Sequence, residues 1–156
     1  MSGEAARYLR QLAEFRWENA TGHALAELDA AATSTDSPAW PEDVEARARD
    51  VTVGLARTWA SPDGQQQVRE VEKLYRDMIA ASRNSIYIEN QYFTSHSITG
   101  YLCDSLEAER GPEIVMVLPG ETSGWLEQAT MEVLRDRALA RLQEADRHGR
   151  FTAVAP

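Results

Sequence analysis

The stretch from Ser85 to Thr94, "SIYIENQYFT", decides the fold class. Isoleucine and aromatic residues in its first half predict a buried strand, and the triplet Glu89-Asn90-Gln91 follows where that strand would end. On both sides of it, over 68–83 and 97–110, apolar residues recur at helical spacing. A strand between two such helices is typical of a sheet whose strands run parallel.

The remaining sequence continues this alternation of strands and helices. Val51, Val53 and Leu55 recur at every second position, which predicts a strand. The run "EIVMVLP" is almost continuously apolar, as is typical of a strand covered on both faces. We therefore expect an α/β layered sandwich with a mostly parallel central sheet. The expected strands lie at 51–58, 85–89, 113–119 and 150–156, and the expected helices lie at 68–83, 97–110 and 125–148.

The chain before this core divides into a helix and a linker. Residues 1–33 contain a predicted N-terminal helix, in which Ser2 can cap the first turn and Gly22 can end the last one. Its apolar stripe consists of Leu9, Leu12, Ala13 and Trp17. Residues 34–49 begin with many Ser, Thr, Asp and Pro residues and predict a linker. This leaves 50–156 as the α/β core.

Composition limits the class of protein. The 156 residues carry a formal net charge of −9, which argues against a nucleic-acid partner because such binding depends on a basic surface. The single cysteine, Cys103, excludes an internal disulfide, and its place on an apolar helical face predicts core packing. The first residues lack the apolar run of a signal peptide, and no stretch is apolar for long enough to span a bilayer. We therefore expect a cytoplasmic protein.

Polar residues gather where the predicted parallel strands end. Glu89, Asn90 and Gln91 follow one strand, and Arg57 closes another. Ligands of open α/β sheets bind at the carboxyl ends of the strands, so these residues could form one wall of a polar cleft. The alternative is a hydrogen-bond network that holds the strand ends together without binding any ligand.

The usual catalytic sets cannot be assembled from this sequence. His23, His96 and His148 are scattered, and the serines on either side of His96 are expected to cap the following helix. There is no G-x-S-x-G elbow, no Walker loop and no zinc-ligand spacing. Glu89 and Glu121 remain as an alternative pair of carboxylates for acid–base chemistry. We predict that this chain contains no catalytic residue, no metal site and no cofactor.

Several segments resemble the phospholipase D superfamily. "SIYIENQYFTS" resembles the motif that precedes the second catalytic signature of these enzymes, and the likeness continues through "VMVLP", "GWLEQATM" and "RLQEADRHGRFTAVAP". Upstream, "RWENATG" and "VTVGLART" are similar to the segment that follows the first signature. The resemblance covers nearly the whole chain and implies a phospholipase D-like fold that is incomplete here.

The resemblance also implies a chemistry whose central residues are missing. Members of the superfamily carry two H-x-K-x4-D signatures: one histidine attacks phosphorus, and the other protonates the leaving alcohol. None of the three histidines of this chain has a lysine two positions later, so neither signature is present. We therefore expect the chain to be the middle of a longer enzyme and to be inactive by itself.

Two interpretations follow. In the first, the chain is part of a phospholipase D-like phosphodiesterase or phosphatidyltransferase that acts on phospholipids or other phosphodiesters. In that enzyme Glu89, Asn90 and Gln91 support the wall of the cleft, and the complete protein could contact a membrane surface. In the second, the chain is a non-catalytic α/β module that binds a phosphorylated headgroup or a partner protein. For a phosphorylated headgroup, the candidate contacts are Arg57 and the same three residues, with Trp125 at the rim. Either way, exposed sheet edges favour self-association.

Overall fold

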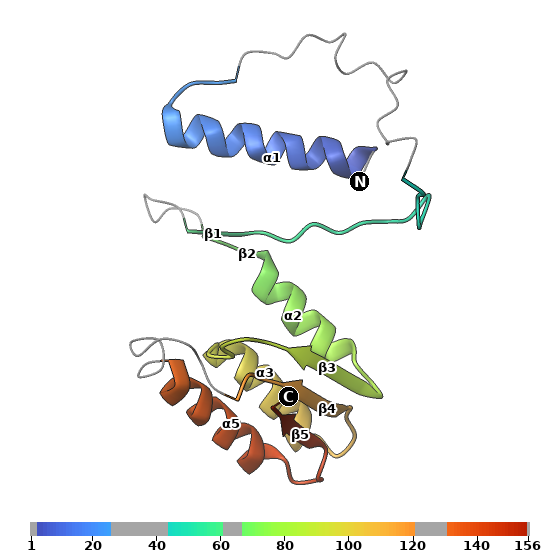
Figure 1. The fold of residues 1–156 in the computed structure, drawn as a ribbon, viewed down its shortest axis with the longest axis vertical. Helices are drawn as coiled ribbons and strands as arrows, with labels where there is room; N and C mark the ends of the chain where they lie inside the picture. Colours follow the sequence, from blue (N-terminus) through green and yellow to red (C-terminus); the bar gives the residue numbers. More distant parts are fainter. Residues whose placement is uncertain (1–2, 26–43, 61–66, 121–130, 156) are drawn as a thin grey trace. The chain divides into compact units, whose positions relative to one another are not determined.

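The computed structural model describes residues 3–25, 44–60, 67–120 and 131–155 (Figure 1). The chain separates into two compact units, Met1–Leu55 and Ala56–Pro156. Of the expected linker at 34–49, residues 44–49 are described, and they form neither a helix nor a strand.

The first unit contains helix α1, Glu4–Thr21, and this part of the sequence prediction is confirmed. Gly22 ends the helix as expected, with a φ of 72° that favours glycine, and its N–H donates to the Glu18 carbonyl over 2.8 Å. The expected cap at Ser2 is wrong, because the N-cap position is occupied by Gly3 and no side chain caps the helix. No residue of α1 is buried, so its apolar stripe, which includes the exposed Leu9 and Trp17, does not form a core.

The strand expected at 51–58 is wrong. Residues 51–57 form no strand, and both Val51 and Val53 are exposed. The first strand, β1, begins only at Thr58 and pairs antiparallel with β2, Gln67–Arg69, through Thr58–Ala60. An alternating pattern shows which side chains can share a face, but a strand also needs a neighbour that accepts its backbone hydrogen bonds.

The second unit holds the predicted alternation of helices and strands. The three parallel strands have the order β3-β4-β5, so the mixed α/β class and the parallel sheet are confirmed. The helix expected at 125–148 is described only from 131 onward. The elements that follow β2 are α2 (Glu70–Ala81), β3 (Ser85–Glu89), α3 (His96–Glu107), β4 (Glu113–Val117), α5 (Val133–Ala145) and β5 (Phe151–Val154).

The core lies between the sheet and two of these helices. Ile114 and Met116 of β4 are fully buried and belong to one apolar cluster with Leu102 and Leu106 of α3 and Leu142 of α5. Because side chains alternate across a strand, the residues between them point to the opposite side of the sheet.

No described helix or strand packs against that opposite side of the sheet. Tyr87 of β3 is 64% exposed, Val115 of β4 is 37% exposed and Val154 of β5 is 44% exposed. The register places Tyr87 opposite Val115, and Val115 opposite Thr152. The expectation that the run at 113–119 is covered on both faces is therefore wrong for the described part of the chain. A continuous apolar run shows that both faces of a strand can be buried, but the covering layer must come from elsewhere.

One carboxylate holds the connection from α5 to β5. Asp146, which follows α5, accepts hydrogen bonds from the backbone N–H groups of Arg150 (2.8 Å) and Phe151 (2.9 Å). Burial alone would raise the pKa of Asp146, but these backbone donors, with that of His148, hold it below its ordinary value. Gly149, the expected end of the helix, instead lies in this turn with a φ of 66°.

Replacing Asp146 by Ala should destabilise the fold. The substitution leaves the backbone N–H groups of Arg150, Phe151 and His148 without their charged acceptor. We expect this to cost about 1–3 kcal/mol in the free energy of unfolding. Urea denaturation followed by circular dichroism measures this cost. Asp136→Ala on α5, where the side chain is 72% exposed, serves as the matched control and should change stability by less than about 0.5 kcal/mol. Equal effects of the two substitutions would contradict this role of Asp146.

Candidate functional site

The candidate site begins at the carboxyl end of β3. Glu89 is the last residue of the strand, and it accepts a hydrogen bond from the Tyr87 hydroxyl on the uncovered side of the sheet. Asn90 continues the ladder, because its N–H donates to the Val117 carbonyl over 3.1 Å. The polar triplet therefore lies at the end of the strand where α/β proteins bind ligands.

Asn90 also shapes the loop that leaves the strand. Its Oδ1 accepts hydrogen bonds from the backbone N–H groups of Tyr92 (3.0 Å) and Phe93 (2.7 Å). These bonds hold Phe93 at a φ of 46°, which is unusual for a residue with a bulky side chain, while its ring is buried in the core. The carbonyl oxygen of the Asn90 side chain thus stabilises a turn, whereas the neighbouring Gln91 is exposed.

Arg57 belongs to a different cluster of contacts. Its guanidinium binds the Glu70 carboxylate through Nε (2.9 Å) and Nη2 (2.7 Å), and its backbone N–H donates to the same carboxylate over 3.0 Å. In return, the Glu70 N–H donates to the Arg57 carbonyl over 2.9 Å. A phosphate group would have to compete with Glu70 for Arg57, so the described role of Arg57 is to join the start of β1 to the start of α2.

This ion pair makes stability depend on pH. The side-chain hydrogen bond from Arg57 lowers the pKa of Glu70 below its ordinary value of 4.5, although burial acts in the opposite direction. A carboxyl group whose pKa is lowered by folding stabilises the fold above its unfolded pKa, and this contribution disappears as the pH falls through the lowered value.

We therefore expect Glu70→Gln to melt at a lower temperature than the parent chain near pH 7. The difference should shrink once the pH falls below about 4, because the parent also loses the carboxylate charge there. Thermal melts of both proteins from about pH 7 to about pH 3 measure the effect. Glu109→Gln, at an exposed position, is the control. A difference that stays constant over the whole pH range would contradict the charge-based explanation.

A second group of polar residues lies at the start of α3, where sequence analysis placed only a helix cap. Ser95 is that cap, as expected: its Oγ accepts from the Ile98 N–H over 3.4 Å. His96 follows it, and the Arg141 guanidinium of α5 lies 3.1 Å from His96 Nδ1. A guanidinium can only donate, so Arg141 is the donor in this contact.

Arg135 of α5 also extends toward the end of a strand. Its Nη1 donates to the carbonyl of Pro119, which follows β4, over 3.1 Å. No local pattern in the sequence indicates Arg135 or Arg141, because each lies in α5 and contacts a residue that is distant along the chain: Pro119 after β4 and His96 at the start of α3. Together with His96, they add hydrogen-bond donors to an edge that sequence analysis described by Glu89, Asn90 and Gln91 alone.

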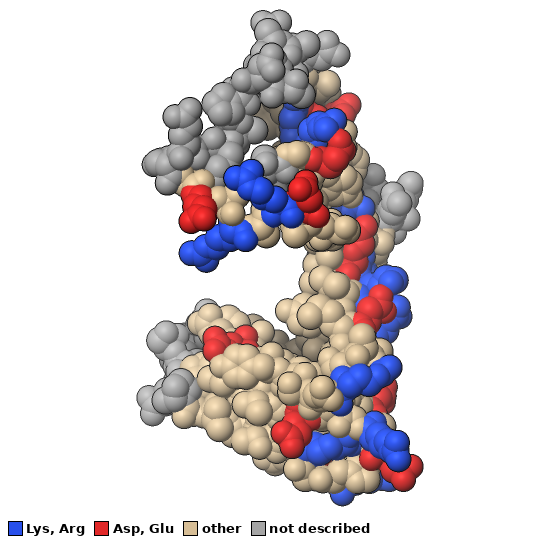
Figure 2. All heavy atoms as spheres, turned by 90° about the vertical axis from the view of Figure 1, so that its right-hand side faces the viewer, with Lys and Arg blue, Asp and Glu red and all other residues tan. Residues whose placement is uncertain are grey.

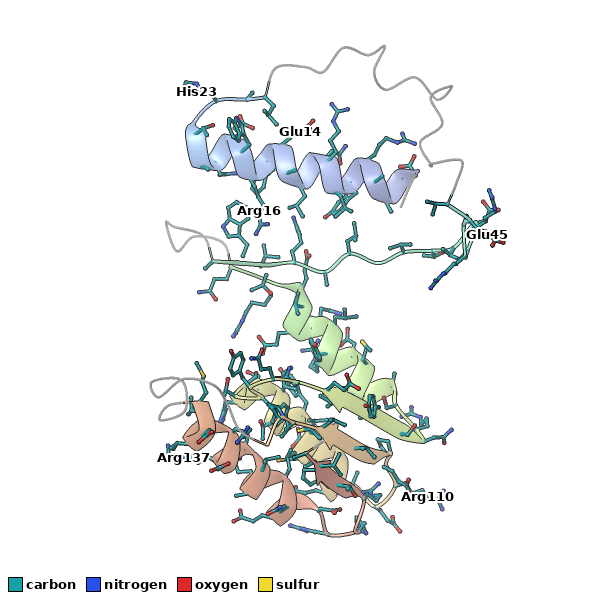
Figure 3. All side chains as sticks on the ribbon, viewed as in Figure 1. Glu14, Arg16, His23, Glu45, Arg110 and Arg137 are labelled. Atoms are coloured by element: carbon teal, nitrogen blue, oxygen red, sulfur yellow. The ribbon has the colours of Figure 1, made fainter. Side chains whose placement is uncertain are left out.

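The other candidate residues do not add to this group. Trp125 and Glu121 lie outside the described residues. His23 extends away from the segment that follows α1 (Figure 3). Burial raises the pKa of the Cys103 thiol, and its Sγ lies 3.7 Å from the Arg141 carbonyl, as is typical of a packed core cysteine. Within the described ranges, no three His, Cys, Asp or Glu residues are grouped so as to hold a metal ion.

The described surface carries a mixture of charges. Figure 2 shows basic and acidic side chains next to one another on the face that it presents. Several ion pairs of the described residues lie within one helix, such as Arg10 with Glu14 over 2.6 Å. None of the described helices combines the length and apolarity that a membrane crossing needs. A hollow in the first unit is lined by the start of α1 and by residues 44–55, and none of the residues proposed for the cleft lines it.

Comparisons with models of protein families, with curated proteins and with solved structures find no match to this chain. The description of the site therefore depends on the residues themselves.

The contact between Tyr87 and Glu89 predicts a measurable change in titration. The hydrogen bond to the Glu89 carboxylate raises the pKa of the Tyr87 phenol above its ordinary value of 10.0, with smaller effects from burial and from the negative charge. Glu89→Gln should lower this pKa toward 10.0. Ultraviolet titration, with Tyr87→Phe to identify the signal, measures it. Glu113→Gln, an exposed acid at the other end of the sheet, should leave the pKa unchanged, and an equal shift in both variants would refute the assignment.

Proposed function

We propose that this chain supplies part of the α/β scaffold and one wall of the phosphodiester cleft in a phospholipase D-like phosphodiesterase or phosphatidyltransferase that acts on phospholipids. The observation that carries the proposal is the polar triplet Glu89-Asn90-Gln91 at the carboxyl end of a strand in a parallel sheet. The same triplet lies in the segment that resembles the superfamily motif.

In this proposal the residues of the edge have separate tasks. Asn90 fixes the turn after β3 through its bonds to the Tyr92 and Phe93 N–H groups, and this orients the exposed Gln91. Arg141 and His96 can donate hydrogen bonds to the oxygens of a phosphoryl group, which bear negative charge that donors stabilise. These groups bind and orient, and none of them is an activated nucleophile.

Without the two signatures, we expect the isolated chain to have no phosphodiesterase activity. No histidine in the sequence belongs to an H-x-K-x4-D motif, so the group that would attack phosphorus must come from another segment or another chain. We expect the isolated chain to hydrolyse neither phosphatidylcholine vesicles nor bis(p-nitrophenyl) phosphate above the rate in buffer. Measurable hydrolysis that copurifies with the chain and is abolished by His96→Ala would contradict this mechanism, because the attacking group would then lie in this chain.

The mass of the natural protein tests whether the chain is part of a larger enzyme. An antibody against this segment should recover from the source cells a species well above 17.4 kDa, with an H-x-K-x4-D signature on each flank. A species of 17.4 kDa would mean that a partner chain has to supply the histidines. In that case the binding-module interpretation would take precedence.

The second candidate function is a non-catalytic module, and the uncovered side of the sheet favours it. Tyr87, Val115 and Val154 present apolar surface there that a partner protein could bury. For the version that binds a phosphorylated headgroup, titration with glycerophosphocholine provides the test. Unchanged binding in Gln91→Ala and Arg141→Ala would exclude the proposed edge as the binding site.

A further inference from the structure

Among the described strands, none pairs with the backbone groups on the outer edge of β3. On the inner side, the Glu113 N–H donates to the Asn84 carbonyl (2.9 Å) and the Asn90 N–H donates to the Val117 carbonyl (3.1 Å). In a parallel ladder, every second residue of a strand directs its backbone N–H and C=O groups to the same neighbouring strand. Between Asn84 and Asn90, the residues whose backbone groups point away from β4 are therefore Ser85, Tyr87 and Glu89. In the part of the chain that the structure describes, no strand pairs with this edge.

This edge also lacks the usual protection against pairing. Natural edge strands carry lysine, proline or a bulge that discourages the addition of another strand. The sequence of β3, "SIYIE", contains neither lysine nor proline, and its five residues pair in unbroken register with β4. Isoleucine and tyrosine also have high propensity for strands. The edge is therefore suited to accept another strand.

Helix α2 adds apolar surface at the same margin. It packs against α3, which packs against α5, so the helices have the order α2-α3-α5 over strands in the order β3-β4-β5. Both α2 and β3 thus lie on one margin of this unit. On α2, Leu74, Tyr75 and Met78 are exposed, with Met78 at 59%. A margin that combines open backbone groups with exposed apolar side chains is typical of an interface.

We propose that this margin binds a second copy of the chain, with the two β3 strands antiparallel and a two-fold axis at Tyr87. Tyr87 then faces the partner's Tyr87, and Ser85 faces the partner's Glu89. In this register, Ser85, Tyr87 and Glu89 each form a hydrogen-bonded backbone pair with a residue of the second copy. The Ser85 hydroxyl can donate to the partner's carboxylate, and the two tyrosines form a cross-strand aromatic pair. The interface is isologous, so the assembly closes as a dimer with one continuous sheet.

The other edge of the sheet is less suited to this pairing. The Ile114 N–H donates to the Arg150 carbonyl (2.7 Å) and the Leu118 N–H donates to the Val154 carbonyl (3.0 Å). By the same alternation, Phe151 and Ala153 are the only residues of β5 whose backbone N–H and C=O groups point away from β4. This shorter edge has no polar pair comparable to Ser85 with Glu89, so β5 remains at the end of the dimer sheet.

Charge predicts how the dimer responds to salt. Each copy carries a formal net charge of −9, so the two copies repel each other at long range. Salt screens this repulsion. The backbone hydrogen bonds and apolar contacts of the interface depend less on salt concentration. We therefore expect the dimer to become tighter as sodium chloride concentration rises, which is opposite to an interface held by ion pairs.

Sedimentation velocity over a range of protein concentrations tests the dimer. The parent chain should show a reversible monomer–dimer equilibrium, and Tyr87→Lys should raise the dissociation constant by at least about tenfold, because two lysines would face each other across the axis. Thr152→Lys is the matched control, because Thr152 lies in the same row and on the same side of the sheet but on β5. Circular dichroism checks that both variants are folded. A parent chain that remains monomeric at all concentrations would overturn the proposal.

Crosslinking tests the register without weakening the pairing. Facing residues in a hydrogen-bonded antiparallel pair have Cα atoms about 5.5 Å apart, within the range that a disulfide spans. Under mild oxidation, Tyr87→Cys should form a covalent dimer and Thr152→Cys should not. The native Cys103 is buried and serves as an internal control in the parent. Equal crosslinking of the two variants, or polymers longer than a dimer, would refute the closed β3 interface.

Discussion

Strand β4 lies between β3 and β5 and bonds to both of them, so the sheet of the second unit depends on its backbone. One side of β4 also supplies the centre of the core, where Ile114 and Met116 are fully buried against α3 and α5. Loss of this strand would leave two separated strands and would remove the surface on which both helices pack. The apolar run at 113–119 therefore contributes both the central backbone of the sheet and the buried centre of the core.

Arg150, which immediately precedes β5, connects this strand to the end of α3. Its Nη2 donates to the carbonyls of Leu106 (2.8 Å) and Ala108 (2.5 Å), while its backbone N–H is held by Asp146. These bonds satisfy carbonyl groups that a helix end leaves without partners. Gly111 lies beside this contact, and a Cβ at that position would be 2.5 Å from Arg150 Nη1 and 2.7 Å from the Ser105 carbonyl oxygen, so another residue would require the backbone as well as the guanidinium to shift. The side chain and the backbone N–H of this one residue thus link the ends of α3 and α5 to the start of β5.

The candidate site consists of residues with structural roles and residues that remain exposed. Asn90 and Arg57 each bind neighbours that hold their own segments in place, which limits what they can offer a ligand. Gln91 and His96 are exposed at the edge where the strands end, and Arg141 lies beside His96. These groups can donate hydrogen bonds, and the sequence contains neither H-x-K-x4-D signature. In the function that we propose, these groups would support a site in a larger assembly.

Local patterns in the sequence were sufficient to predict α1 with its Gly22 end, the helices α2 and α3, the Ser95 cap and the β3 strand with its polar end. Each of these depends on residues within a few positions of one another, and hydrophobic spacing and turn chemistry act over that range. The failed strand at 51–58 and the uncovered side of β4 depended instead on whether another element would lie alongside. The pairs Arg57–Glu70 and His96–Arg141 join residues 13 and 45 positions apart, so no local pattern contains them. Only the tertiary structure decided these contacts, because packing determines which distant backbone and side-chain groups come within bonding distance.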